Sequence, residues 1–250
     1  MPGRKSPLGG SSLTYEYTVR LLSIGETLFL LRKTPGFSEQ CRRWRGRDFR
    51  ATFFELFAAR LFLAGGFQIH AKPEIMVRGE DYDFTAINGD ASINVEVTAL
   101  TVVKYTERTI WNALNDKRDQ VPVDAPAVLI CIIPETWLDE AGCDKKLENI
   151  TSDFFRRQTR RINAVVYVSE KHIDKDGDGS YGMLIFRTLV YFHPNPRIPC
   201  PELAFLSDGP SLNRTGEALR ASSDPFVDGV TLLRATSEFY QWVDQTCRLG

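Results

Sequence analysis

The stretch Glu80 to Leu100, EDYDFTAINGDASINVEVTAL, decides the fold. It holds two β-type runs on either side of Asn88-Gly89-Asp90, a tight-turn signal that predicts an antiparallel hairpin. Asp83 and Glu96 interrupt these otherwise apolar runs, one in each strand. Because an unpaired carboxylate is costly in a poorly solvated sheet, the two acids predict a cation, a shared proton or a basic side chain beside them. A hard metal ion is the leading candidate.

Predicted helices and strands alternate around this hairpin. The predicted helices cover residues 13–33, a segment that starts near Ser38, and residues 48–64, 106–120 and 139–161. The predicted strands cover residues 67–70, 82–87, 93–100, 127–134, 163–170 and 183–192. This order indicates an α/β fold with a central mixed β-sheet flanked by helices.

The bulk composition is that of a globular protein, with 250 residues of which 43% are hydrophobic and 25% charged. We expect a flexible tail over residues 1–12, an N-terminal helical annex over 13–47 and one α/β domain over 48–250. No run approaches the roughly 20 apolar residues of a membrane span, and no apolar signal-peptide core precedes the annex. The five cysteines are an odd number without metal-ligand spacing, which favours a reducing compartment. These features predict a cytoplasmic protein without membrane contact.

The order helix, three-strand meander, helix and strand, with an acid on the second and third strands, resembles the PD-(D/E)XK nuclease superfamily. The resemblance covers roughly residues 48–135 and implies a restriction-endonuclease-like fold. Asp83 stands at the position of the first-motif aspartate, and Glu96 matches the acidic residue of the second motif. Thr98 stands where the second motif has its lysine.

The resemblance also implies how the missing lysine is replaced. In some superfamily members a residue on the following helix takes its role, and here Lys117 and Gln120 lie one turn apart near the end of that helix. Glu55, on the helix before the meander, matches an auxiliary acid.

The implied activity is phosphodiester hydrolysis with Mg or Mn. Mg²⁺ prefers oxygen ligands, which Asp83, Glu96 and the Val97 carbonyl can supply. DNA is the expected substrate and RNA stays open. Each such site cuts one strand, so double-strand cleavage favours a homodimer.

Each candidate residue also has a simpler explanation. These are a strand end for Asp83, a cross-strand ion pair for Glu96, pairing of Glu55 with Arg50 or Arg60, and a solvated helix end for Lys117. The alternative function is therefore a catalytically inactive nuclease-like module that binds nucleic acid or a protein partner.

Two basic clusters are candidate nucleic-acid contacts although the net charge is only −1. The first comprises Arg42, Arg43, Trp44, Arg45 and Arg47, with Trp44 available to stack on a base, and the second comprises Arg156 and Arg157 with Arg160 and Arg161. The alternative is that these arginines pack their stems and pair with nearby acids.

The loop from Asp174, DKDGDGSYG, resembles a calcium loop but has Ile185 where an EF-hand needs a bidentate Glu, so it indicates a solvated hairpin loop.

Overall fold

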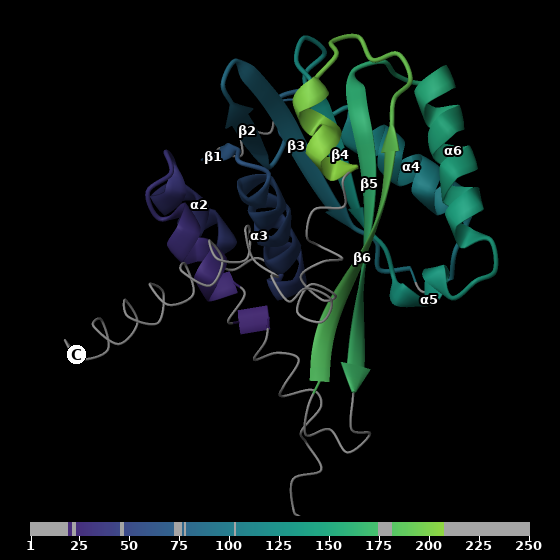
Figure 1. The fold of residues 1–250 in the computed structure, drawn as a ribbon, viewed down its shortest axis with the longest axis horizontal. Helices are drawn as coiled ribbons and strands as arrows, with labels where there is room; N and C mark the ends of the chain where they lie inside the picture. Colours follow the sequence, from purple (N-terminus) through teal and green to yellow (C-terminus); the bar gives the residue numbers. More distant parts are fainter. Residues whose placement is uncertain are drawn as a thin grey trace, which may run out of the picture.

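Six strands form one sheet whose spatial order is the order of the chain, in the computed structural model of this protein (Figure 1). The strands are β1 (Gln68–Ala71), β2 (Phe84–Asn88), β3 (Ala91–Ala99), β4 (Ala127–Ile132), β5 (Ile162–Asp174) and β6 (Gly182–Phe192). The helices are α2 (Phe37–Trp44), α3 (Phe49–Ala64), α4 (Glu107–Arg118), α5 (Glu135–Leu138) and α6 (Cys143–Arg157), followed by the 3-10 helix η1 (Pro201–Leu206). The structure describes residues 20–21, 24–45, 48–72, 77, 79–102, 104–174 and 182–207.

The strand directions make the sheet mixed. β1, β2 and β3 form an antiparallel meander, β3, β4 and β5 run parallel to one another, and β6 returns antiparallel to β5. The parallel pairs need crossover connections, which α4 and the α5–α6 segment provide. The predicted α/β class, with a mixed sheet flanked by helices, is confirmed.

Alternation along β3 assigns its side chains to two layers. Ile93, Val95 and Val97 belong to the core cluster that contains the buried residues of α3. Glu96 therefore points to the opposite face, since successive strand side chains alternate. Leu129 of β4 points to that second face too, where it packs with residues of α4 and α6. The sheet is thus covered by α3 on one face and by α4 and α6 on the other (Figure 1).

Helix α3 is apolar around most of its circumference because it is covered on two sides. It begins at the N-cap Asp48, whose side chain accepts a hydrogen bond from the Ala51 N–H at 3.0 Å. One side packs on the sheet, and the residues Leu31, Phe37 and Trp44 of the N-terminal segment pack against the same cluster. A helix that is hydrophobic all round is a buried helix, as here.

Two boundaries differ from those expected from sequence. The predicted helix over 139–161 is shorter, since α6 covers Cys143–Arg157 and begins after Gly142, whose left-handed φ of 73° ends the helical path on its N-terminal side. Asp83 lies one residue before β2 instead of within it. The predicted calcium-like loop covers residues 174–182, of which 175–181 lie outside the described residues, as does the predicted tail over residues 1–12.

An aromatic cluster closes the end of α3 against η1. The Phe62 ring lies 5.5 Å from Phe67 and 5.4 Å from Phe205, measured between ring centroids. Gly65 ends α3 beneath this cluster, and a Cβ atom there would lie 2.6 Å from the Phe205 ring. The absence of a side chain at Gly65 therefore lets η1 dock on α3.

We predict that Gly65→Ala lowers the free energy of unfolding by about 1–3 kcal/mol, because the added methyl group overpacks the Phe205 ring. Urea denaturation measures the change. Phe205→Leu in the same chain should recover part of the loss. Gly66→Ala is the control, since Gly66 has a φ of 82° with open space around it, so its strain comes from the backbone. If Phe205→Leu restored the free energy of unfolding of Gly65→Ala and Gly66→Ala equally, the packing explanation would be contradicted.

Candidate functional site

The centre of the candidate site is an ion pair between the sheet and helix α4. Lys117 Nζ donates a hydrogen bond to Glu96 Oε1 at 2.5 Å. The Glu96 side chain is 3% exposed and the Lys117 side chain 24% exposed, so the pair lies at the inner edge of the solvent-facing region. The simpler explanation of a cross-strand ion pair for Glu96 is wrong, because its partner comes from a helix.

Asp83 joins this centre from the start of β2. Its carboxylate is buried, and Oδ2 accepts a hydrogen bond from the Val97 N–H at 2.8 Å. The backbone ladder between β2 and β3 ends just before this point, with the Asp83 N–H donating to the Val95 carbonyl at 3.1 Å. The Asp83 side chain thus extends the ladder by one bond, which agrees with the simpler explanation of a strand end. The same contact brings a carboxylate beside Val97, next to Glu96.

Gln120 holds Lys117 from the turn after α4. Lys117 Nζ also donates to Gln120 Oε1 at 2.9 Å, so its ammonium lies between a carboxylate and an amide oxygen. The Gln120 carbonyl accepts a hydrogen bond from the Asp81 N–H at 3.1 Å, and the Asp119 carbonyl accepts one from the Gly79 N–H at 2.9 Å. These two bonds tie the end of α4 to the segment that leads into Asp83. Lys117 and Asp83 therefore belong to one hydrogen-bonded unit.

Burial and the neighbouring charges shift the proton equilibria of this centre. Burial, with the negative charge of Asp83 beside it, raises the pKa of the Glu96 carboxyl well above its usual range, while Lys117 acts to lower it. Burial acts to lower the pKa of Lys117, but the Glu96 carboxylate outweighs this effect, so the pKa of Lys117 is raised. Lys117 therefore stays an ammonium at neutral pH. Cys131, nearby on β4, is inert as a nucleophile because burial raises the pKa of its thiol to about 12.

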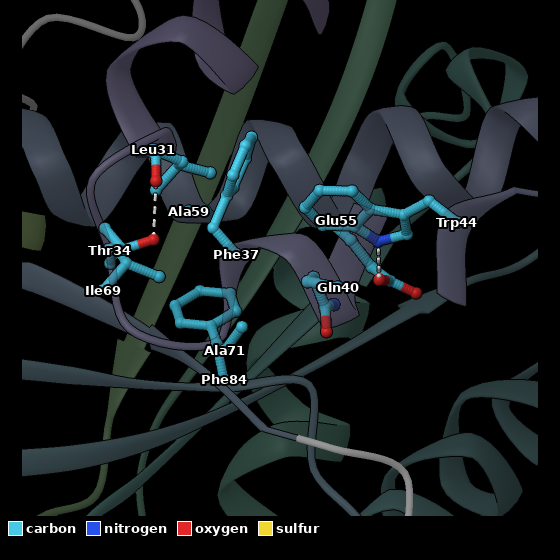
Figure 2. Close-up of a pocket in the computed structure, with 10 residues that line it drawn as sticks. All are labelled: Leu31, Thr34, Phe37, Gln40, Trp44, Glu55, Ala59, Ile69, Ala71 and Phe84. Carbon is cyan, nitrogen blue, oxygen red and sulfur yellow. Dashed lines mark hydrogen bonds between the residues drawn. The ribbon is translucent and has the colours of Figure 1, made fainter. Parts of the chain in front are cut away.

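Glu55 reaches this region from the other side of the sheet. It lies on α3 and is buried, and its Oε2 accepts a hydrogen bond from the Trp44 indole N–H at 2.8 Å (Figure 2). The indole and Glu55 line a small, mostly apolar pocket between α2, α3 and β1. Glu55 still contributes to the field at the centre, since its negative charge helps to raise the pKa of Glu96. Of the two arginines considered as partners, Arg60 pairs with Glu26 at 2.8 Å.

The oxygen atoms of Asp83, Glu96 and the Val97 carbonyl are ligands of the type that a hard cation prefers, although they are few. Glu96 Oε2 is buried and takes no hydrogen bond from any described residue, so one carboxylate oxygen remains available. The Asp83 carboxylate and the Val97 carbonyl lie along the same edge. Within the described part of the chain, no three His, Cys, Asp or Glu side chains form a metal-holding group. The site therefore offers two carboxylates, and Mg²⁺ is commonly bound by one or two carboxylates together with substrate phosphates and water.

The two predicted basic clusters are mostly occupied by local contacts. Arg42 pairs with Glu39 at 2.6 Å, and Trp44 is held by Glu55 in the pocket, so its ring is not presented for stacking. Arg156 pairs with Asp153 at 2.5 Å and Arg157 approaches the same acid at 3.7 Å. Arg45 is exposed, Arg47 lies outside the described residues, and the side chain of Arg43 also lies outside them.

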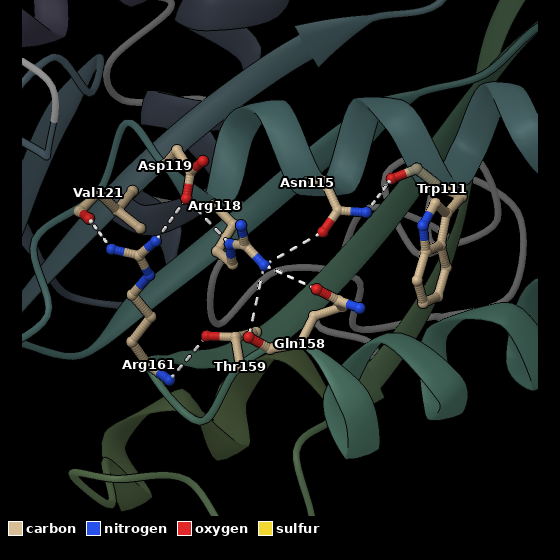
Figure 3. A network of polar contacts seen from close by, with 8 residues as sticks. All are labelled: Trp111, Asn115, Arg118, Asp119, Val121, Gln158, Thr159 and Arg161. Carbon is tan, nitrogen blue, oxygen red and sulfur yellow. Dashed lines mark hydrogen bonds and ion pairs between the residues drawn. The ribbon is translucent and has the colours of Figure 1, made fainter.

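No pattern in the sequence predicts the contacts that anchor the end of α4. Asp119 accepts hydrogen bonds from Arg118 Nε at 3.0 Å and from Arg161 Nη2 at 2.8 Å (Figure 3). Arg161 also donates to the Val121 carbonyl at 3.1 Å. Arg161 is separated from Asp119 by 42 positions, so no local pattern relates them. This network fixes the helix end from which Lys117 reaches the sheet.

Comparison with known proteins finds no match to this chain among family models, curated proteins or solved structures. Of the helices that the structure describes, none is both long and apolar enough to span a membrane.

We predict that Lys117→Met lowers the free energy of unfolding at pH 7 by roughly 1–3 kcal/mol, because it leaves the buried Glu96 carboxylate without its partner. Chemical denaturation measures the loss. The double variant with Glu96→Gln should be less destabilised than the sum of the two single variants. Lys145→Met is the matched control, since the Lys145 side chain is 69% exposed. Additive effects at Lys117 and Glu96 would contradict the coupling.

The cost of Lys117→Met should depend on pH in a defined direction. The raised pKa of Glu96 means that folding favours its protonated form, so acidification through that pKa removes the unpaired charge and shrinks the cost. The raised pKa of Lys117 means that its contribution to the free energy of unfolding is fully present below about pH 10.4. This contribution is lost as the pH rises through the pKa of Lys117 in the folded state. Denaturation from pH 4 to 11 should give the largest difference between the two proteins near neutral pH. A difference that does not vary with pH would exclude an electrostatic origin.

Proposed function

We propose that this protein is a metal-dependent phosphodiesterase that hydrolyses nucleic acid, with DNA as the expected substrate, on a restriction-endonuclease-like fold. One observation carries the proposal: a lysine from α4 lies on the second-motif carboxylate, with the first-motif aspartate beside it. Thr98 occupies the usual lysine position on β3, and Lys117 supplies an ammonium to the same carboxylate from another element.

The strand order supports the proposed fold. An antiparallel meander, β1 to β3, is followed by α4 and by a strand β4 that is parallel to β3. Helix α3 precedes the meander and covers the face opposite α4. This is the order of elements on which the resemblance was based, and the two carboxylates lie where β2 and β3 part.

Asp83, Glu96 and the Val97 carbonyl would hold the Mg²⁺ or Mn²⁺ ion of such an enzyme. When bound, the ion supplies Lewis-acid stabilisation of the phosphate and a more acidic bound water. Binding requires Glu96 as a carboxylate, and Lys117 opposes the burial that favours its protonated form. The free Glu96 Oε2 is the oxygen that Lys117 leaves available.

Lys117 would act as a fixed cation and not as a base. Its pKa is raised, so it keeps its proton at neutral pH and can donate hydrogen bonds to an attacking water or to a phosphate oxygen. Gln120 orients the ammonium through its amide oxygen. Glu55 remains the candidate auxiliary acid, acting on Glu96 through its charge.

The alternative function keeps the fold and omits catalysis. Lys117 donates to Glu96, the Val97 N–H donates to Asp83, and Gln120 accepts from Lys117, so much of the polar capacity of the centre is satisfied within the chain, as expected of a structural ion-pair centre. Such a protein would bind nucleic acid or a protein partner without cutting. The two functions differ in their response to a divalent ion.

We predict that the purified protein cleaves members of a DNA and RNA panel only with Mg²⁺ or Mn²⁺, and that Asp83→Asn, Glu96→Gln and Lys117→Met each reduce the rate about 100-fold or more. Asparagine retains an oxygen that can accept the Val97 N–H, so Asp83→Asn should fold. Gel electrophoresis of end-labelled substrates measures the rate.

Asp90→Asn and Lys145→Met are the matched controls, since both side chains are exposed, and both should retain full activity. Circular dichroism checks that every variant is folded. Equal cleavage by the parent and all three site variants would exclude the carboxylate site. Binding without cleavage under any divalent-ion condition would favour the inactive module.

A further inference from the structure

A polar hollow lies beside the end of α4, apart from the carboxylate centre. Of the second predicted basic cluster it contains Arg160 and Arg161, and its other arginines were not predicted. Its volume is about 610 Å³, which is large enough for a phosphate group and part of a nucleotide. The hollow is lined by Arg118, Val123, Gln158, Thr159, Arg160, Arg161 and Arg197. These residues come from the end of α4 and the segment that follows it, from the segment between α6 and β5, and from the segment after β6.

The charge around the hollow is strongly unbalanced. Four guanidinium groups line it, and Asp119 is the acid that pairs with two of them, Arg118 and Arg161. Both arginines share one carboxylate oxygen, Asp119 Oδ1, so their combined charge exceeds that of their partner. The hollow therefore carries net positive charge.

Arg160 and Arg197 retain donors that no residue in the described chain uses. Arg160 donates to the Asn195 carbonyl and to Asn195 Oδ1, both at 3.0 Å, through Nε and Nη2. These neutral acceptors orient its guanidinium without neutralising it. The Arg197 guanidinium makes no ion pair or hydrogen bond with the described residues, while its backbone N–H donates to the Arg160 carbonyl at 2.6 Å. The backbone bond thus places the two residues side by side, with the Arg160 guanidinium oriented by Asn195 and neither charge matched by an acid among the described residues.

The remaining groups rigidify the wall of the hollow. Arg118 Nη1 donates to Gln158 Oε1 at 3.1 Å and to Asn115 Oδ1 at 3.2 Å (Figure 3). The Thr159 hydroxyl accepts a hydrogen bond from the Arg161 N–H at 3.1 Å and its proton remains available for donation. Like-charged side chains repel one another, so a preorganised group of arginines implies an anionic ligand that matches them.

We propose that this hollow binds a phosphate group, either a backbone phosphate of a nucleic-acid strand or the phosphate of a free nucleotide. Guanidinium forks match phosphate oxygens in planar, two-bond geometry. The hollow is distinct from the carboxylate centre, and residues 117–120 connect them: Lys117 and Gln120 belong to the centre, while Arg118 lines the hollow and Asp119 braces it. If the protein cuts nucleic acid as proposed, this site would hold a second phosphate of the same substrate.

The proposal is tested by measuring the binding of three probes, which are inorganic phosphate, a mononucleotide and a fluorescent single-stranded DNA of 12 nucleotides. This length places several phosphates on the surface. Arg160→Gln combined with Arg197→Gln should weaken binding at least about tenfold, and the oligonucleotide should lose about 0.7 in salt-dependence slope per lost phosphate contact. Both side chains are exposed, so these variants should fold. If the Arg160 and Arg197 changes weaken binding of the oligonucleotide alone, the ligand is a strand phosphate. If they weaken binding of the mononucleotide equally, the ligand is a free nucleotide.

Arg187→Gln is the control for each of the single variants Arg160→Gln and Arg197→Gln, because it likewise removes one positive charge, from an exposed residue that pairs with Asp144 on α6. It should leave binding within about twofold. Equal effects of Arg187→Gln and of the Arg160 and Arg197 changes, or no effect of either, would overturn the proposal. Lys117→Met separates this site from the catalytic one, since it should abolish cleavage and preserve binding at the hollow. If binding depends on Arg160 and Arg197 but the protein never cleaves nucleic acid, the phosphate site would be supported and the nuclease function refuted.

Discussion

A carboxylate buried in the middle of a sheet needs a cation, and in this protein that need is met by one lysine from the opposite layer. Glu96 lies on β3 beneath α4, and Lys117 reaches down from the last turn of that helix to pair with it. The pair fixes where α4 lies on the sheet, because displacement of the helix would strand a charge in a region of low dielectric. The Lys117–Glu96 pair therefore sets both the position of α4 on the sheet and the charge balance of the site.

The end of α4 is correspondingly well anchored. Asp119 binds two arginines, and backbone hydrogen bonds connect residues 119 and 120 to the segment that leads into Asp83. Asp83 in turn completes the hydrogen bonding of β3 at Val97. The same few contacts that hold the layers together also bring two carboxylates, an ammonium and an amide to one place. The structural role of these contacts is compatible with the proposed catalytic one, since one oxygen of Glu96 is left without a partner among the described residues.

The basic residues divide into two kinds. Arg42, Arg156 and Arg157 are exposed and paired with acids one turn away on their own helices, an arrangement typical of solvated helix surfaces. The arginines around the hollow instead come from three separate segments and outnumber their acidic partner. Proximity in sequence is thus an incomplete guide to a shared ligand. It grouped Arg156 and Arg157 with Arg160 and Arg161, yet the first two pair with Asp153 on their own helix and only the last two line the hollow.

The sequence by itself determined the α/β class, the hairpin at Asn88-Gly89-Asp90 and the placement of one acid on β3 and another at the start of β2, because alternation and turn chemistry are local properties. It also indicated Lys117 and Gln120 as candidates, through a resemblance and a one-turn spacing. Only the tertiary structure decided that Lys117 pairs with Glu96, that Glu55 lies on the other face with Trp44, and that Arg161 braces Asp119. These contacts join residues that are 11 to 42 positions apart, and their geometry depends on how helices pack across the sheet.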